Sequence, residues 1–459
     1  MAEDAAAKRA EADERSGEAE IGAKARGNAE RPWAVLTFLR TYPAFTWLWV
    51  GQMVSRLGDS IDAIAFVWLV LELTGSTLLM GTLLVVNMLP SILLNPVAGV
   101  WIDRLPRRPV IVISDAARAV TTGLVAALYL AGLLEVWHLY VVTTLNSIFE
   151  AFAVPARVAV IAQVVSGEDL VSANSLTSLS SSLASLFGLL LAAPLFKLLG
   201  IAGAIGLDAA TFLFAALTAL TASIPEIPTV SAGQEGGRTT LTGALTSFWS
   251  DLREGMHLVI TQRVILYLII LAGLANFAFG PLEVLMPVYV REVLKMDVGQ
   301  LSQVYLAFSL GALASGLLTM RVARKWPEAV LVLVGLGLMG TGYAFLYFAR
   351  SFLVTLGLIT LMGIGQAPAQ AGLRTAVQRR TPPAVLGRVA GLLGTFSLSA
   401  TPLSLALTGA VAEAVAAPVI FGAFGLLVLV LTVLILSRPV FGLFQTCKPG
   451  AILWKKSSG

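Results

Sequence analysis

Cysteine and histidine are almost absent from this chain of 459 residues, which holds one cysteine and two histidines. The single Cys447 lies near the end of the chain, so the sequence offers neither a disulfide framework nor a thiolate metal site. No glycine-rich loop followed by Lys-Ser or Lys-Thr is present to bind nucleotide phosphates, and no nucleophile–base pair is visible. These absences argue against an enzyme, a resident cofactor and energy from nucleotide hydrolysis within the chain.

Charge is scarce as well, because only 13% of the residues are charged whereas 57% are hydrophobic. The mean hydropathy is +0.84, and the chain holds 42 glycines. Ordinary soluble domains are less hydrophobic than this. The composition therefore predicts an all-α protein that crosses a lipid bilayer many times.

Apolar runs of roughly 20 residues, the length that crosses a hydrocarbon core as a helix, recur along the chain. Six precede the polar stretch 225–261 and six follow it, which predicts two six-helix bundles joined by a linker. The expected spans are 45–73, 78–100, 110–134, 137–164, 170–199, 202–223, 264–290, 301–322, 329–348, 352–376, 389–412 and 419–436. The predicted domains are a tail (1–40), a bundle (41–224), a linker with an interfacial helix (225–262), a second bundle (263–438) and a second tail (439–459).

The positions of the basic residues predict the orientation of these spans. Arginine and lysine gather in the even-numbered connections, whereas the odd-numbered ones hold only Lys197, Arg291, Lys295 and Arg350. Short cytoplasmic loops retain positive charge, so we expect both termini and the linker in the cytoplasm. The net charge of +4 then reflects membrane topology and not a surface for nucleic acid.

The loop between the second and third spans has the pattern Gly99-x-x-x-Asp103-Arg104-x-x-Arg107-Arg108. A similar pattern returns at 316–325, with Met320 in place of the acid, so the chain looks duplicated. The first loop resembles the signature between helices two and three of the major facilitator superfamily, with Pro106 where glycine is usual. Further segments resemble the branch that contains macrolide-efflux and enterobactin-exporter proteins, namely 49–59, 152–157, 169–176, 251–255 and 383–389.

This resemblance implies two bundles that rock about a central site in the bacterial cytoplasmic (inner) membrane. Asp103 can then lie against the N-terminus of span eleven, near Gly387 and Arg388, where unpaired N–H groups attract an anion. Such a contact would hold the cytoplasmic side closed. Arg104, Arg107 and Arg108 either pair across the same seam or serve only as cytoplasmic anchors.

Charged residues inside the spans are costly and therefore mark function. Arg56 with Asp59, and Asp115 with Arg118, are spaced to neutralise each other within a helix. Asp62 and Glu150 have no opposite charge within four residues. We therefore expect the coupling ion, a proton or sodium, to bind at Asp62 first, Glu150 second and Asp59 third; the alternative for each is a polar side chain that fixes helix packing in a wet cavity. Asp208 is expected to be structural.

A cavity for a mainly apolar organic molecule needs aromatic and amide side chains. The candidates that could line it are Phe66, Trp68, Asn146, Phe149, Asn276, Phe279, Glu283 and Gln366, although aromatic residues in spans also serve packing and contact lipid. The sequence thus predicts a monomeric, proton-coupled secondary transporter that exports amphiphilic compounds such as antibiotics or siderophore-like metabolites. Two alternatives stay open: an importer or lipid flippase of the same fold, and a membrane receptor or assembly factor that has lost transport.

Overall fold

The computed structural model describes residues 33–102, 105–224, 266, 270, 272–273, 276–277, 280–322, 325–380 and 386–436. Over these residues the regular secondary structure is helical, with no strand. Eight of the described helices are long and apolar enough to cross a membrane. The all-α membrane fold predicted from composition is confirmed. The predicted linker helix and most of both predicted tails lie outside the described residues.

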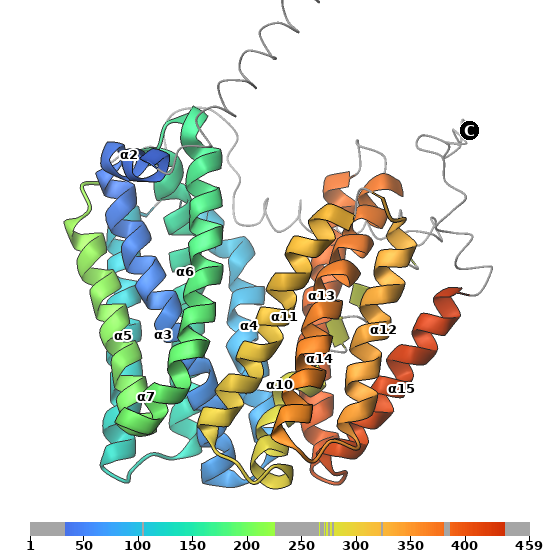
Figure 1. Ribbon diagram of the computed structural model, residues 1–459. Helices are drawn as coiled ribbons and strands as arrows, with labels where there is room; N and C mark the ends of the chain where they lie inside the picture. Colours follow the sequence, from blue (N-terminus) through green and yellow to red (C-terminus); the bar gives the residue numbers. More distant parts are fainter. Residues whose placement is uncertain are drawn as a thin grey trace, which may run out of the picture.

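The helices form two bundles that stand side by side in Figure 1. Most predicted spans match one helix each, and the fifth and sixth match the two helical halves of α7, which are separated by the non-helical turn at Gly200. The first bundle holds α2 (Trp33–Thr41), α3 (Pro43–Thr74), α4 (Thr77–Ile102), α5 (Arg107–Leu130), α6 (Val136–Val164) and α7 (Leu170–Thr221). The second holds α10 (Gly280–Val288), α11 (Val298–Val322), α12 (Glu328–Leu346), α13 (Phe352–Arg380), α14 (Leu386–Ala412) and α15 (Ala417–Leu436).

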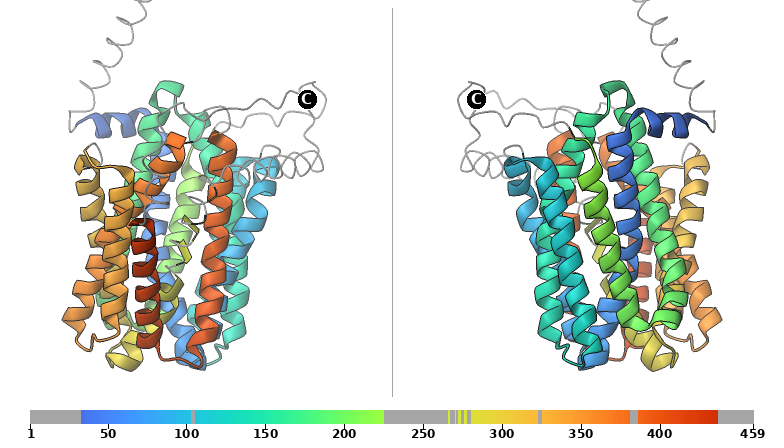
Figure 2. Two further views of the ribbon diagram at one scale, coloured as in Figure 1. Left: turned by 90° about the vertical axis from the view of Figure 1, so that its right-hand side faces the viewer. Right: turned by 90° about the vertical axis from the view of Figure 1, so that its left-hand side faces the viewer.

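Three tight turns of the first bundle use glycine with positive φ. Gly75 ends α3, Gly132 follows α5, and Gly200 divides α7, with φ of 66°, 69° and 67°. Only glycine adopts this left-handed conformation without a steric penalty, which lets a helix end abruptly. All three turns lie at the same end of the bundle, which we call the Gly75 end; the opposite end, where α4 leads into α5, is the Pro106 end (Figure 2).

The bundles touch most extensively through α4 with α14 and α7 with α11, and α10 and α11 also contact α3. At the Gly75 end the backbones of α4 and α14 approach closely at two glycines. A Cβ added to Gly81 would lie 2.5 Å from the carbonyl oxygen of Leu405, and one added to Gly409 would lie 2.8 Å from that of Thr77. Both positions therefore need glycine for the two bundles to meet.

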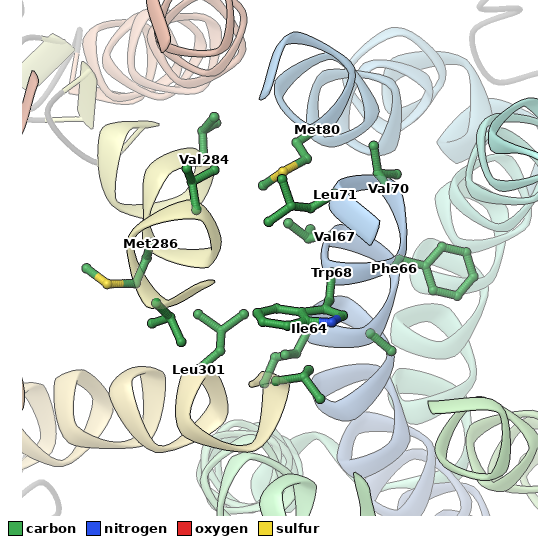
Figure 3. Packing of buried hydrophobic residues seen from close by; sticks show 14 of the residues in the cluster. Ile64, Phe66, Val67, Trp68, Val70, Leu71, Met80, Val284, Met286 and Leu301 are labelled. Carbon is green, nitrogen blue, oxygen red and sulfur yellow. The ribbon is translucent and has the colours of Figure 1, made fainter. Parts of the chain in front are cut away.

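An apolar cluster fills the space between the bundles near the same end. Trp68 and Leu71 of α3 lie there with Met286 of α10 and Leu301 of α11 (Figure 3). Trp68 is buried in this cluster, and its expected place in the lining of a substrate cavity stays a prediction. The cluster closes the Gly75 end of the seam between the bundles.

Candidate functional site

A cavity of about 200 Å³ lies inside the first bundle. It collects five of the charged residues that the sequence placed inside spans, together with apolar side chains from α3 and α4. Its lining residues are Arg56, Asp59, Asp62, Ala63, Phe66, Val67, Leu83, Leu84, Asn87, Arg118, Thr143, Asn146 and Glu150. The cavity thus combines charge with apolar walls, the composition that suits an amphiphilic ligand.

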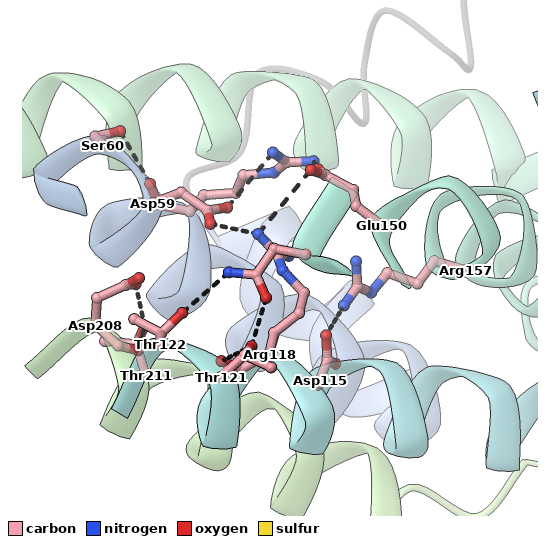
Figure 4. A network of polar contacts seen from close by, with 12 residues as sticks. Asp59, Ser60, Asp115, Arg118, Thr121, Thr122, Glu150, Arg157, Asp208 and Thr211 are labelled. Carbon is pink, nitrogen blue, oxygen red and sulfur yellow. Dashed lines mark hydrogen bonds and ion pairs between the residues drawn. The ribbon is translucent and has the colours of Figure 1, made fainter. Parts of the chain in front are cut away.

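Two arginines and two acids of the cavity form one connected group, which we call the four-charge network (Figure 4). Arg118 Nη2 lies 2.8 Å from Asp59 Oδ1 and 4.0 Å from Glu150 Oε2. Arg56 lies 3.0 Å from Glu150 Oε1 and 3.5 Å from Asp59 Oδ2. The expected contact between Arg56 and Asp59 is present. Glu150, which lacks a partner in its own helix, finds partners on α3 and α5.

The expected pairing of Asp115 with Arg118 within α5 is wrong. Asp115 instead forms an ion pair with Arg157 of α6, while Arg118 turns to Asp59 of α3. Asp115 is 1% exposed and faces the neighbouring helix, so a partner across the helix interface neutralises it more completely than one on its own helix surface. Arg118 also lies over the ring of Phe212 in α7, with 4.0 Å between Cζ and the ring centroid.

Asp62 differs from the other cavity acids because no described cation lies within 4 Å of it. Its Oδ1 is buried and has no hydrogen-bond partner among the described residues. Asp62 follows Asp59 by three residues on α3, so both carboxyls project toward the same side of the helix. It is thus the cavity carboxyl that the four-charge network does not neutralise.

The remaining candidate cavity residues are divided. Phe66 and Asn146 line the cavity, and the amide of Asn146 is held by Thr121 at 2.6 Å and Thr122 at 3.1 Å. Phe149 is half-buried and does not line the cavity. Asn276 donates a hydrogen bond to the carbonyl of Ala272, four residues earlier in the chain. Asn276, Glu283 and Gln366 are not among the residues that line this cavity. Phe279 lies outside the described residues.

Sequence reasoning missed two polar lining residues, Asn87 of α4 and Thr143 of α6. Asn87 interrupts a run of apolar residues in α4, and that interruption was a usable signal. The carbonyl of Asn87 accepts a hydrogen bond from Ser147 at 2.5 Å, which ties α4 to α6 beside the cavity.

The structure describes only part of the loop signature at residues 99–108. Asp103 and Arg104 lie outside the described residues, as do the side chains around Gly99, Gly387 and Arg388. Arg107 donates to Gln163 of α6 at 3.2 Å, and Arg108 donates to carbonyl oxygens at the C-terminal end of α7, Ala219 at 3.3 Å and Leu220. Both arginines are therefore held within the first bundle, and in this structure these contacts do not cross the seam.

The two bundles are also joined by charges at helix ends, at the turn between α3 and α4. Arg291 of the second bundle donates to the carbonyl of Leu71 at 2.7 Å, near the C-terminal end of α3. Glu413, just after α14, accepts from the backbone N–H of Leu78 at 3.0 Å and from the Ser76 hydroxyl at 2.6 Å, at the start of α4. The positive charge of Arg291 lies near the negative C-terminal end of the α3 dipole, and the negative charge of Glu413 lies at the positive N-terminal end of the α4 dipole, so both contacts are favourable. The hydrogen bonds from Leu78 and Ser76 hold the pKa of the Glu413 carboxyl below its usual value.

A cavity lined by charged residues inside a bundle of membrane helices, with a second helical bundle beside it, is typical of a membrane transporter. The model of the Major Facilitator Superfamily matches residues 48–404, and the chain belongs to this superfamily. It is 25% identical over 376 residues to macrolide efflux protein A of Streptococcus pyogenes, which covers 80% of this chain and 89% of that one. It is 26% identical over 395 residues to the multidrug efflux pump Tap of Mycolicibacterium fortuitum, covering 85% and 94%.

Solved structures are similar in fold. The nucleoside transporter NupG matches with a TM-score of 0.66 and 13% identity, over 88% of this chain and 100% of that one. An inward-facing, unoccupied bacterial homologue of the human lysosomal transporter Spinster matches with a TM-score of 0.62 and 14% identity, over 88% and 96%. The predicted superfamily is thus confirmed, and the relatives found by sequence include the macrolide-efflux proteins that the sequence segments resemble.

Proposed function

We propose that this transporter exports amphiphilic organic compounds across the bacterial cytoplasmic membrane in exchange for protons. The export direction is supported by its similarity to a macrolide efflux protein and a multidrug efflux pump. The amphiphilic substrate is supported by the cavity, which Phe66, Leu83 and Leu84 line together with charged and amide groups. Antibiotics and siderophore-like metabolites have this mixed character.

The observation that carries proton coupling is the carboxyl of Asp62. A lone charge inside a membrane helix costs at least about 2.5–3.5 kcal/mol, so a carboxyl without a cation either holds a proton or pairs with a bound cation. Asp62 has no cation within 4 Å among the described residues and lies on the cavity wall. Substrate arrival can therefore displace its proton, and proton binding can displace the substrate. Sodium is the alternative coupling ion.

The direction in which the cavity opens follows from the charge distribution. Basic loop residues gather at the Pro106 end, which supports a cytoplasmic location for that end and for both termini. The Gly75 end then faces outward, where the apolar cluster and the contacts of Arg291 and Glu413 hold the bundles together. The conformation described would thus be closed to the outside, and release of substrate would require these contacts to separate.

Proton release on substrate binding is the direct test. Purified protein in weakly buffered detergent is mixed with a panel of lipophilic drugs and siderophores, and the pH change is compared among wild type, Asp62→Asn and Glu150→Gln. The matched control is Glu72→Gln, an exposed acid at the end of the same helix. We expect Asp62→Asn to bind substrate without release and the control to behave as wild type. Binding without release in wild type would refute proton antiport.

The direction of transport needs a separate experiment in cells. Expression should lower the steady-state content of a fluorescent substrate, and Asp62→Asn should abolish that depletion. Accumulation on expression would instead indicate an importer. If expression changes the cellular content of none of the compounds that bind, a receptor or assembly role would be favoured.

A further inference from the structure

Asp208 of α7 is a buried carboxyl that neither the cavity nor the four-charge network includes. It is 0% exposed, and no described cation lies within 4 Å of it. Its Oδ2 has no hydrogen-bond partner among the described residues. A carboxylate in such a place would be a charge without compensation.

The hydrogen bonds of Asp208 indicate where its proton lies. The Thr211 hydroxyl has one proton and lies 2.7 Å from the backbone carbonyl of Asp208 and 3.1 Å from its Oδ1. It can donate to only one of them. If Oδ1 carries a proton and donates to Thr211, and Thr211 donates to the nearer carbonyl, both contacts become proper hydrogen bonds. The geometry therefore favours a neutral Asp208 with its proton on Oδ1.

The neutral carboxyl lies against α3 one turn away from Asp62. Oδ1 of Asp208 and the hydroxyl of Thr211 fill the space that a Cβ on Gly58 would occupy. Gly58 precedes Asp62 by four residues, and a helical side chain leans over the turn on its N-terminal side. Asp62 thus leans toward the turn on which Asp208 rests, and each acid has one buried oxygen without a partner.

Few charged groups face this pair of carboxyls. From α3 they are Asp59 and Asp62, and from α5 Arg118, which is already bound to Asp59 and lies over Phe212. Two other helices pack on α7: α6, whose Glu150 and Arg157 are bound to Arg56 and Asp115, and α11, which has no charged residue before Arg321. Among the described residues, no cation is available to neutralise Asp62 and Asp208 together. The protonation of one carboxyl therefore depends on the protonation of the other.

We propose that Asp208 is a second proton-carrying residue, in series with Asp62. Asp62 exchanges protons with the cavity, and Asp208 stores one in the dry contact between α3 and α7. After Asp62 has released its proton to the cavity, the proton on Asp208 Oδ1 moves to the Asp62 carboxylate. Asp208 becomes the carboxylate, and the pair carries one negative charge before and after this transfer. Asp62 is then able to release a second proton.

Infrared spectroscopy tests the stored proton without any substrate. At a pH where exposed carboxyls are ionised, Asp208→Asn should remove intensity from the carbonyl stretch of neutral carboxylic acids. Thr211→Val should shift that band, because Oδ1–H loses its acceptor, and Glu72→Gln should leave it unchanged. An unchanged band in both Asp208→Asn and Thr211→Val would overturn the proposal. If the asparagine variant does not fold, the shift in Thr211→Val decides alone.

Proton counting tests the series order, and this part rests on the proposed antiport function. Per substrate bound, we expect Asp208→Asn to release about half the protons of wild type and Asp62→Asn to release none, because of these two carboxyls Asp62 is the one that lines the cavity. Equal release by Asp208→Asn and wild type would refute the relay while leaving antiport intact. No release by wild type would refute antiport. The infrared experiment would still decide whether Asp208 holds a proton, because it does not depend on substrate.

Discussion

Glu413 accepts a hydrogen bond from the backbone N–H of Leu78, so an acid that follows α14 in the second bundle caps the first turn of α4 in the first. Arg291 contacts the carbonyl of Leu71 on the other side of the same turn. The anion lies at a helix N-terminus and the cation near a helix C-terminus, where each is stabilised by the helix dipole. The contact is therefore specific for the arrangement in which the Gly75 end is closed.

Removing the charge of Glu413 should favour the conformation that is open at the Gly75 end. Spin labels at Leu73 and Ala414, both exposed and on different bundles, would report this separation in a Cys447→Ser background. We expect Glu413→Gln to increase the population of long distances several-fold, with Glu72→Gln as the control. An unchanged distance distribution would show that this contact does not hold the bundles together.

Lowering the pH should likewise favour the conformation of the wild-type protein that is open at the Gly75 end. The pKa of Glu413 is lowered in the closed conformation, chiefly by the hydrogen bond from Leu78, so its contribution to that conformation is complete above the ordinary glutamate pKa. The contribution is lost as the pH falls through the lowered value. The same spin-label pair should report longer distances in wild type over this range. Glu413→Gln should show no such step, and a step of equal size there would assign the effect to another group.

The glycine contact between α4 and α14 leads to a third expectation. A methyl group at Gly81 would lie 2.5 Å from the backbone oxygen of Leu405, which cannot move without moving α14. Gly81→Ala should therefore separate the bundles at the Gly75 end and slow export. Gly206→Ala adds the same methyl group where no heavy atom lies within 4 Å, and it should behave as wild type. Similar spin-label distances in both variants would argue against close backbone packing here.

The ion pair between Asp115 and Arg157 should stabilise the first bundle. Both side chains are at most 9% exposed, and loss of one partner leaves a buried charge, which typically costs about 3–5 kcal/mol. We expect Asp115→Asn to lower the thermal midpoint in detergent. The double variant Asp115→Asn with Arg157→Gln should lose less stability than the sum of the two single variants. Additive losses would mean that the two residues act independently.

The sequence predicted the helices well because span length is a local property. The run 419–436 corresponds to α15 at Ala417–Leu436, and 137–164 to α6 at Val136–Val164. The charged candidates Asp59, Asp62 and Glu150 do meet in one cavity. Their residue type and their position inside apolar runs were sufficient to single them out.

Partners across helix interfaces could not be predicted in this way. Arg118 was assigned to Asp115, three residues away, because local spacing says nothing about how α5 is rotated toward α3 and α6. The packing of Trp68 could not be predicted for the same reason, since α3 is apolar around much of its circumference near that residue. Glu413 follows the end of a span, where an acid is usually solvated, and only the arrangement of the bundles shows what it caps.

The four-charge network has an electrical consequence. Its two guanidinium groups and two carboxylates sum to zero, so a transmembrane voltage exerts no net force on it as the bundles move. One elementary charge moved across 100 mV is worth about 2.3 kcal/mol, and within this cavity that work falls on Asp62 and whatever binds to it. Exchange of one proton for a monovalent cation would move no net charge. Exchange of a proton for a neutral compound would draw on the voltage as well as on the pH difference.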